Sequence, residues 1–186
     1  MSGKLLMIPT ISFFAPYWEL VYRGKLALYS AAGSSSGKET KYGVKTRKDR
    51  SYSNRGLVLC YTSQKAHTGP MRRYHFNNDD IPRGVVGCAK IVDVVRLTYE
   101  DGIELFRVYN NVRTELELLI ARQSEDTIYA MDYGYLMKPF NRFEKPIMPN
   151  KQYMFGPSGR IPLLPEIEGQ LPKWAKKEVE KMRVAQ

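Results

Sequence analysis

Positively charged side chains are concentrated between Ser36 and Ser63, and this stretch ends in an apolar run at Leu57–Tyr61 that is typical of a strand. An anion-binding surface needs such an arrangement, because its cations must converge on a rigid support. The alternative is a solvated loop whose charges only keep the protein soluble. The cations of this stretch are Lys38, Lys41, Lys45, Arg47, Lys48, Arg50 and Arg55.

Aromatic residues alternate with cations in this stretch and in two later segments. These segments place Tyr74 and Phe76 with Arg72 and Arg73, and Phe140 and Phe143 with Lys138, Arg142 and Lys145. Cations gain affinity for phosphates by releasing counterions, and aromatic rings stack on unpaired bases for roughly 1–3 kcal/mol each. Nothing in the sequence is typical of a helix that reads a DNA major groove. The pattern therefore predicts a binding module for single-stranded or looped RNA, with single-stranded DNA as the alternative ligand. The predicted binding residues are Lys25, Lys45, Arg47, Lys48, Arg50, Tyr52, Arg55, Arg72, Arg73, Tyr74, Tyr135, Arg142 and Lys145.

Catalysis has a weaker basis in the sequence. His67 and His75 are followed by Asp79 and Asp80, and a His–Asp pair could supply a general base. We favour a structural role for them, as groups that hydrogen-bond within a loop. The chain has no phosphate-binding P-loop, no nucleophile elbow and no HExxH motif, and we predict no metal and no cofactor.

Composition sets the broad class. The chain has 186 residues, 43% of them hydrophobic, with a net charge of +10. Such a balance suits one folded domain whose partner is nucleic acid, an anionic membrane or an acidic protein. No apolar run is long enough to span a bilayer, and we identify no signal peptide. Cys60 and Cys88 lie in apolar runs and are predicted to be buried free thiols, so we expect a cytoplasmic protein without a membrane partner.

The elements that would position these residues can be predicted from their apolar spacing. Pro16 suits the start of a helix. The strand at 57–62 is apolar on both faces and should lie inside a sheet. A second strand covers Gly84 to Val95, where Gly87 indicates a bulge or a close backbone approach.

Later segments complete the prediction. Thr114 and Glu117 form a capping-box pattern for a short helix at 114–122. A strand at 128–137 should end at Lys138–Pro139, and a basic helix should cover 172–184, with Trp174 packed on the domain. Segments 64–83 and 156–169 are predicted to be irregular. The fold class is α+β: a small mixed β-barrel with flanking helices and a C-terminal basic helix.

Several of these segments together resemble ASCH domains, which belong to the PUA-like group. Residues 11–25 (ISFFAPYWELVYRGK) resemble the family's opening strand, proline-started helix and Gly-Lys turn. Residues 55–63 (RGLVLCYTS) resemble its next strand, and residues 83–93 (RGVVGCAKIVD) resemble the strand with two glycines that follows. The segment 135–147 is similar to the closing part. We therefore divide the chain into an ASCH/PUA-like domain at 1–156 and an extension with the basic helix at 157–186.

The resemblance implies a PUA-like barrel that binds RNA or modified nucleosides. Some members are amidohydrolases that act on acetylated cytidine, and ribonuclease activity has been proposed for others. The family's Gly-x-Lys-x-x-Glu-x-Arg motif is not matched directly after Gly24, but an insertion could shift it to residues 43–47. In an enzyme of this kind Lys25, Lys45 and Arg47 would be the catalytic candidates, although Lys45 stands where the family has an acidic residue. A third alternative is an adaptor whose basic face meets an acidic protein.

Overall fold

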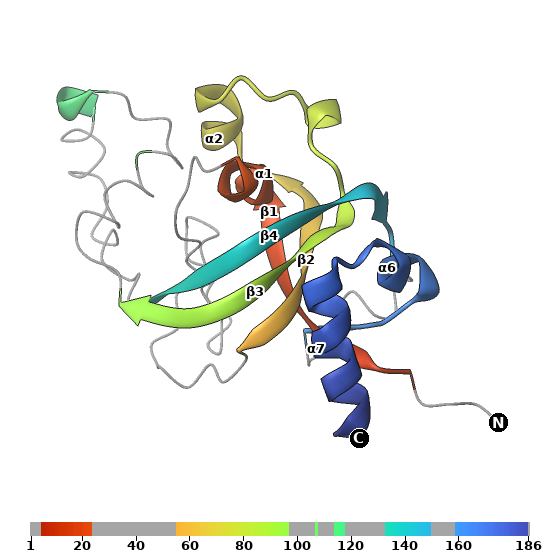
Figure 1. Cartoon of the computed structure of the whole chain (residues 1–186). Coiled ribbons are helices and arrows are strands. Elements are labelled where there is room, and N and C mark those ends of the chain that lie inside the picture. The colour runs from red at the N-terminus through yellow and green to blue at the C-terminus, as the bar shows by residue number, and fades with distance from the viewer. Residues whose placement is uncertain are drawn as a thin grey trace.

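The computed structural model describes residues 5–23, 55–96, 107, 114–117, 133–149 and 159–185; of residues 94–96 and 133–136 it describes the backbone alone. These residues form one mixed five-stranded sheet with helices packed against it, so the α+β class is confirmed (Figure 1). The elements are β1 (Met7–Ala15), α1 (Tyr17–Tyr22), β2 (Gly56–Ala66), α2 (Thr68–Arg73), the 3-10 turn η1 (Asn78–Asp80), β3 (Gly84–Arg96), β4 (Tyr133–Ile147), β5 (Arg160–Pro162), α6 (Pro165–Gln170) and α7 (Lys173–Val184).

The sheet has the strand order β4-β3-β2-β1-β5. Strands β1 and β2 are parallel, with Thr10 opposite Leu59, and the other neighbours are antiparallel. Strand β2 lies in the middle, as its apolar faces predicted, because both of its sides are covered.

Helix α1 covers the first face of the sheet. Its Trp18 and Leu20 pack on Phe13 of β1 and Val58 and Cys60 of β2, all of them buried. Gly87 of β3 makes this packing close, because a Cβ atom there would meet Trp18 at 2.9 Å and the Asn141 carbonyl oxygen of β4 at 2.3 Å. The predicted close backbone approach at Gly87 is therefore confirmed.

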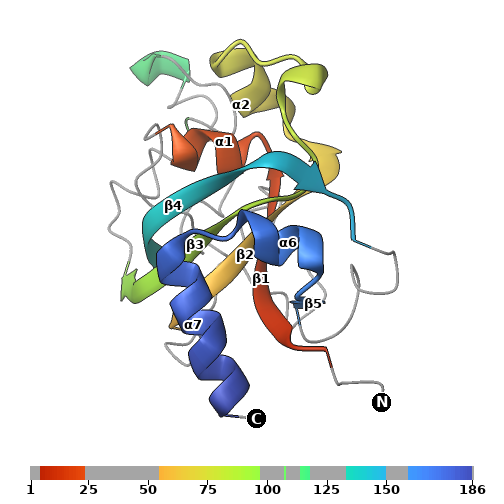
Figure 2. The ribbon, with the colours of Figure 1, turned by 45° about the vertical axis from the view of Figure 1, so that its right-hand side comes forward.

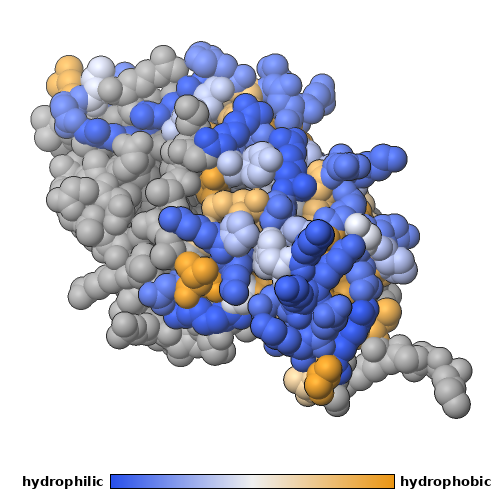
Figure 3. Space-filling model, viewed as in Figure 1, coloured by the Kyte–Doolittle hydropathy of each residue, from blue (hydrophilic) through white to orange (hydrophobic). Residues whose placement is uncertain are grey.

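Helices α6 and α7 cover the second face (Figure 2). Ile167 of α6 and Ala175 and Val179 of α7 are buried against Leu57 and Leu59 of β2. The predicted basic helix is confirmed, and its lysines lie in solvent, so the outer side of α7 is hydrophilic (Figure 3). Its Trp174 packs on the domain as predicted and donates a hydrogen bond of 2.8 Å from Nε1 to Asn141 Oδ1.

The predicted barrel is not closed. In the described part of the chain, β4 pairs only with β3 and β5 pairs only with β1, so the sheet is open at both edges. Strand β5 has only three residues and offers little edge for further pairing. Helices cover both faces, which lets an open mixed sheet bury its core without curling on itself.

Three local predictions were wrong. The segment at 64–83 is not irregular throughout, since it contains the end of β2, α2 and η1, and 156–169 contains β5 and α6. Strand β4 does not end at Pro139 but continues to Ile147. Proline is tolerated there because β4 is an edge strand of the described sheet, and its register with β3 shifts between Met137 and Phe140.

The remaining predictions are tested only where residues are described. Thr114 and Glu117 exchange the two hydrogen bonds of a capping box, as predicted, but 118–122 lie outside the described residues. The same holds for most of the strand predicted at 128–137 and for the basic segment at 38–50. No helix in the described ranges is long and apolar enough to cross a membrane.

Candidate nucleic-acid interface

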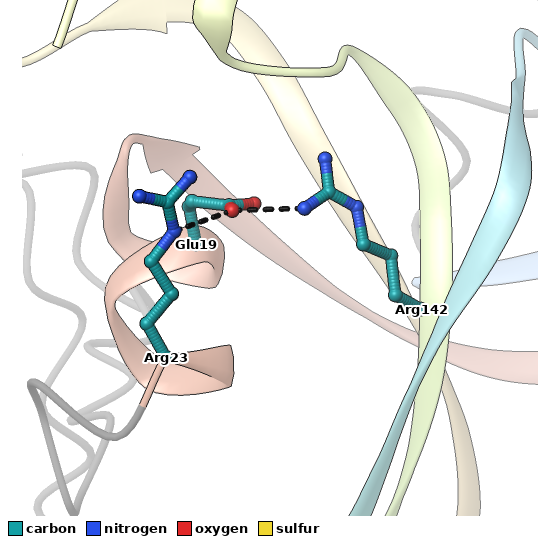
Figure 4. Close-up of polar contacts among 3 residues, drawn as sticks. All are labelled: Glu19, Arg23 and Arg142. Carbon is teal, nitrogen blue, oxygen red and sulfur yellow. Dashed lines mark hydrogen bonds and ion pairs between the residues drawn. The ribbon is translucent and has the colours of Figure 1, made fainter.

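A buried carboxylate joins α1 to β4. Glu19 is 1% exposed, and its Oε1 accepts a hydrogen bond of 2.8 Å from Arg23 Nε and one of 2.9 Å from Arg142 Nη1 (Figure 4). Arg23 follows Glu19 by four residues on the same helical side. Arg142 lies opposite Gly87 in the β3–β4 register, which brings it to the first face beside α1.

Glu19 fixes the two guanidinium groups, but each of them donates only one N–H to it. The side chains of Arg23 and Arg142 are 49% and 37% exposed, and their other N–H groups have no partner in the described parts of the chain. Two cations on one carboxylate leave the cluster with a net positive charge. The arrangement therefore presents oriented hydrogen-bond donors to solvent, which is the usual basis of anion or base-edge recognition by arginine.

An aromatic side chain stands next to these donors. Tyr22 is 42% exposed and stacks on buried Trp18, with ring centroids 6.1 Å apart at 30°. The Arg142 guanidinium carbon lies 5.9 Å from the Tyr22 ring centroid, and that of Arg23 lies 5.0 Å from the Phe76 centroid. Glu19, Tyr22, Arg23, Phe76 and Arg142 together are called the α1–β4 surface below.

The segment after β2 joins this surface. Arg72 and Arg73 are in the last turn of α2, and Tyr74 follows as its C-terminal cap. Tyr74 and Phe76 both pack on the first-face core. Arg23 lies over the Phe76 ring and shares Glu19 with Arg142, so Phe76 links this predicted segment to the surface that holds Arg142.

Other predicted binding residues lie elsewhere. Arg55 pairs with Asp93 at 3.0 Å and lies at the start of β2, whereas Arg72 follows the end of that strand. Eleven strand residues separate the two ends, a span of up to about 33 Å. Lys145 has an exposed side chain, and its backbone N–H donates to Gln170 of α6, which covers the second face.

Several predicted residues are not placed by the structure. Tyr135 pairs with Val94 through its backbone, and its side chain is not described. One aromatic residue that was expected beside the cations, Phe143, is buried in the second-face core and cannot stack on a ligand. The predicted residues outside the described ranges are Lys25, Lys45, Arg47, Lys48, Arg50 and Tyr52.

His67 has a structural environment. It is buried, with its ring 4.5 Å from that of Phe14 and its Nδ1 3.3 Å from the Tyr17 hydroxyl. Burial, and secondly the charge of Lys65, lower the His67 pKa from 6.5 to about 4. The imidazole is therefore neutral at neutral pH. Its ring is packed between neighbours, which favours the structural interpretation over a general base.

Asp80 and the two thiols also have structural roles. Asp80 accepts a hydrogen bond from the Asn77 backbone N–H at the start of η1. Cys60 and Cys88 are free and buried, as predicted, and burial raises the pKa of both thiols, that of Cys88 to about 12. Neither is a thiolate at neutral pH. The described residues contain no cluster of three side chains that could hold a metal ion.

No protein-family model and no curated protein matches this chain. The site must therefore be judged on its own geometry.

Three members of the α1–β4 surface were not predicted: Glu19, Tyr22 and Arg23. A partial signal exists for Tyr22, which lies off the helical face formed by Tyr17, Leu20 and Val21, but Trp18 and Glu19 also lie off that face and are buried. Glu19 and Arg23 have the spacing of a helical ion pair. The burial of Glu19 could not be predicted, since it depends on a partner 123 residues away in the sequence.

Proposed function

We propose that this protein is a PUA-like, ASCH-type RNA-binding module of the cytoplasm, and that the α1–β4 surface binds an unpaired base. One observation carries the proposal: Tyr22 exposes its ring beside two anchored arginines whose remaining N–H groups lack partners in the described residues. The open mixed sheet is compatible with the PUA-like resemblance. Two buried free thiols suit a reducing compartment.

The order of the rings supports stacking of a base. Trp18 is buried and Tyr22 lies on it, so Tyr22 is the outer member of a stack that begins in the core. A base placed on Tyr22 would extend that stack by one ring. Bases in a duplex already stack on their neighbours, so this surface favours single-stranded or looped RNA.

Cations around the surface supply affinity for phosphates in this proposal. Lys65 near the end of β2 and Arg72 in α2 are both exposed. The basic stretch at 38–50 would add further cations. The net charge of +10 would then steer polyanions toward the protein.

Fluorescence anisotropy with a labelled single-stranded RNA octamer tests the proposal. We expect Tyr22→Leu to weaken binding about tenfold, because it removes the stacking ring and keeps the apolar bulk. Tyr22→Trp should retain the affinity, since an indole stacks equally well.

The matched control is Lys177→Ala on α7, an exposed cation on the second-face side. We expect it to change the affinity less than twofold. The proposal is refuted if the octamer does not bind, or if Lys177→Ala weakens binding while Tyr22→Leu does not.

A further inference from the structure

The Glu19 carboxylate between Arg23 and Arg142 makes these two arginines unsuitable as a phosphate site. A phosphate bound by Arg23 and Arg142 would bring its negative oxygens next to Glu19, and like charges at such distances repel. Glu19 Oε2 is fully buried and has no hydrogen-bond partner in the described residues. The neighbouring Trp18 Nε1 is buried and without a partner in the same part of the structure.

Unpaired buried polar atoms carry a free-energy cost, so a group that satisfies them binds favourably. The acceptor Oε2 needs an N–H donor. The remaining N–H groups of Arg23 and Arg142 face solvent and can donate to the acceptors of a ligand. A neutral ring whose donors and acceptors lie side by side meets both requirements, whereas a phosphate meets only the second.

We infer that Glu19, Arg23 and Arg142 form a base-reading site for guanine, an inference that rests on the proposed RNA-binding function. Guanine presents two adjacent N–H donors, N1–H and the N2 amine, beside the O6 and N7 acceptors. A carboxylate accepts from the donors, and arginine donates to O6 and N7 in the commonest specific contact with a base. Each of the other three bases offers fewer donors to the carboxylate.

Access to the site passes between the arginines. Both arginine side chains are partly exposed, whereas Glu19 is buried, so the inference requires the two guanidinium groups to move apart when a base edge binds. Tyr22 stands beside Arg142 and would hold the plane of the same base. The cluster therefore supplies specificity, and the surrounding lysines and arginines supply the sequence-independent affinity.

The test uses the full-length protein and four uridine-rich RNA octamers that differ at one central position: guanine, adenine, cytosine or uracil. We expect the guanine octamer to bind about tenfold more tightly than the other three. Glu19→Gln replaces the Oε2 acceptor by an amide donor and nearly preserves the shape. It should abolish the preference, so that the guanine octamer binds no more tightly than the other three.

A second measurement needs no variant and so does not depend on folding. Inosine at the central position removes the N2 amine, and 7-deazaguanosine removes the N7 acceptor. Each should weaken binding to the wild-type protein several-fold. The inference would be overturned by equal affinities for all four octamers or by a preference for another base. It would also be overturned if the inosine and 7-deazaguanosine octamers bound as tightly as the guanine octamer.

The two proposals fail in different ways. If none of the octamers binds, RNA binding itself is refuted and the guanine site with it. If all four bind equally and Tyr22→Leu still weakens them, RNA binding stands and the guanine site is refuted.

Discussion

At the scale of single residues, Glu19 shows how this fold handles a charge in its interior. Burial of an isolated carboxylate is very unfavourable, and Arg23 and Arg142 compensate for it through short, charge-assisted hydrogen bonds. Both arginines remain partly in solvent, so they lose less hydration than Glu19 does. The cluster therefore ties α1 to β4 and holds two cations at the surface.

Replacement of Glu19 by alanine should destabilise the fold. The change leaves two guanidinium groups facing each other with no anion between them and removes a tie between α1 and β4. We expect the free energy of unfolding to fall by about 2–3 kcal/mol. This is at the low end of the cost of breaking a buried ion pair, because water partly solvates the two arginines. Urea denaturation measures this.

The control is Glu166→Ala, at an exposed position of α6 where the carboxylate forms no ion pair with the described residues. Surface substitutions of this kind usually change stability by no more than about 0.5 kcal/mol. Equal effects of the two substitutions would contradict the role assigned to Glu19.

His67 should make stability depend on pH. Its pKa in the folded protein is about 4, against 6.5 for the free side chain, so the unfolded chain binds a proton at pH values where the folded one does not. The contribution of His67 is therefore fully present above about pH 6.5 and is lost as the pH falls toward 4. The total loss is up to about 3 kcal/mol.

Unfolding by urea at a series of pH values checks this prediction. His67→Gln removes the titrating group, so its curve should fall less steeply than that of the wild type between pH 6.5 and 4. Parallel curves would show that His67 is already solvated in the folded protein.

At the scale of elements, the contact between β3, β4 and α1 depends on Gly87. A side chain at this position would collide with the Asn141 carbonyl oxygen and with Trp18. These contacts are made by backbone and by a packed indole, neither of which moves easily. A small residue at this position is therefore needed both for the β3–β4 pairing and for the placement of Trp18, the ring on which Tyr22 stacks.

Gly87→Ala should cost roughly 3 kcal/mol of stability through overpacking. Gly169→Ala is the matched control, because a Cβ atom there meets nothing within 4 Å and the residue lies in α6. That change should stabilise the protein by up to about 1 kcal/mol, since alanine is the better helix former. Thermal unfolding of both variants tests the pair, and a Gly87→Ala protein as stable as the wild type contradicts the packing described.

Helix α7 is held by one specific polar contact besides its apolar side. Trp174→Phe keeps most of the ring but removes the hydrogen bond to Asn141. We expect a loss of about 1 kcal/mol, measured by urea denaturation. Lys176→Ala, at an exposed position of the same helix, should have no comparable effect.

At the scale of the whole molecule, the sequence predicted what depends on local spacing. The central strand β2, the long strand β3, the close approach at Gly87 and helix α7 all follow from patterns within about a dozen residues. Predictions failed where contacts between residues far apart in the sequence determine the local structure. Pro139 continues a strand because β4 is an edge of the described sheet, and α6 forms in a segment whose prolines and glycines indicated a loop.

The same distinction applies to the candidate site. Arg142 was predicted from a local mixture of charge and aromatic residues, and the structure places it on the first face. Its position beside Glu19 and Tyr22 depends on the pairing of β3 with β4, which brings residues more than a hundred positions apart together. No local pattern contains that information.

The most direct measurement of the central claim is ultraviolet crosslinking of a single-stranded RNA to the full-length protein, followed by mass spectrometry of tryptic peptides. We predict that the main crosslink lies in the peptide 5–23, at Tyr22. Tyr22→Leu should remove it and leave any crosslink at Trp174 unchanged. Crosslinks confined to α7, or a crosslink in peptide 5–23 that survives Tyr22→Leu, would contradict the account.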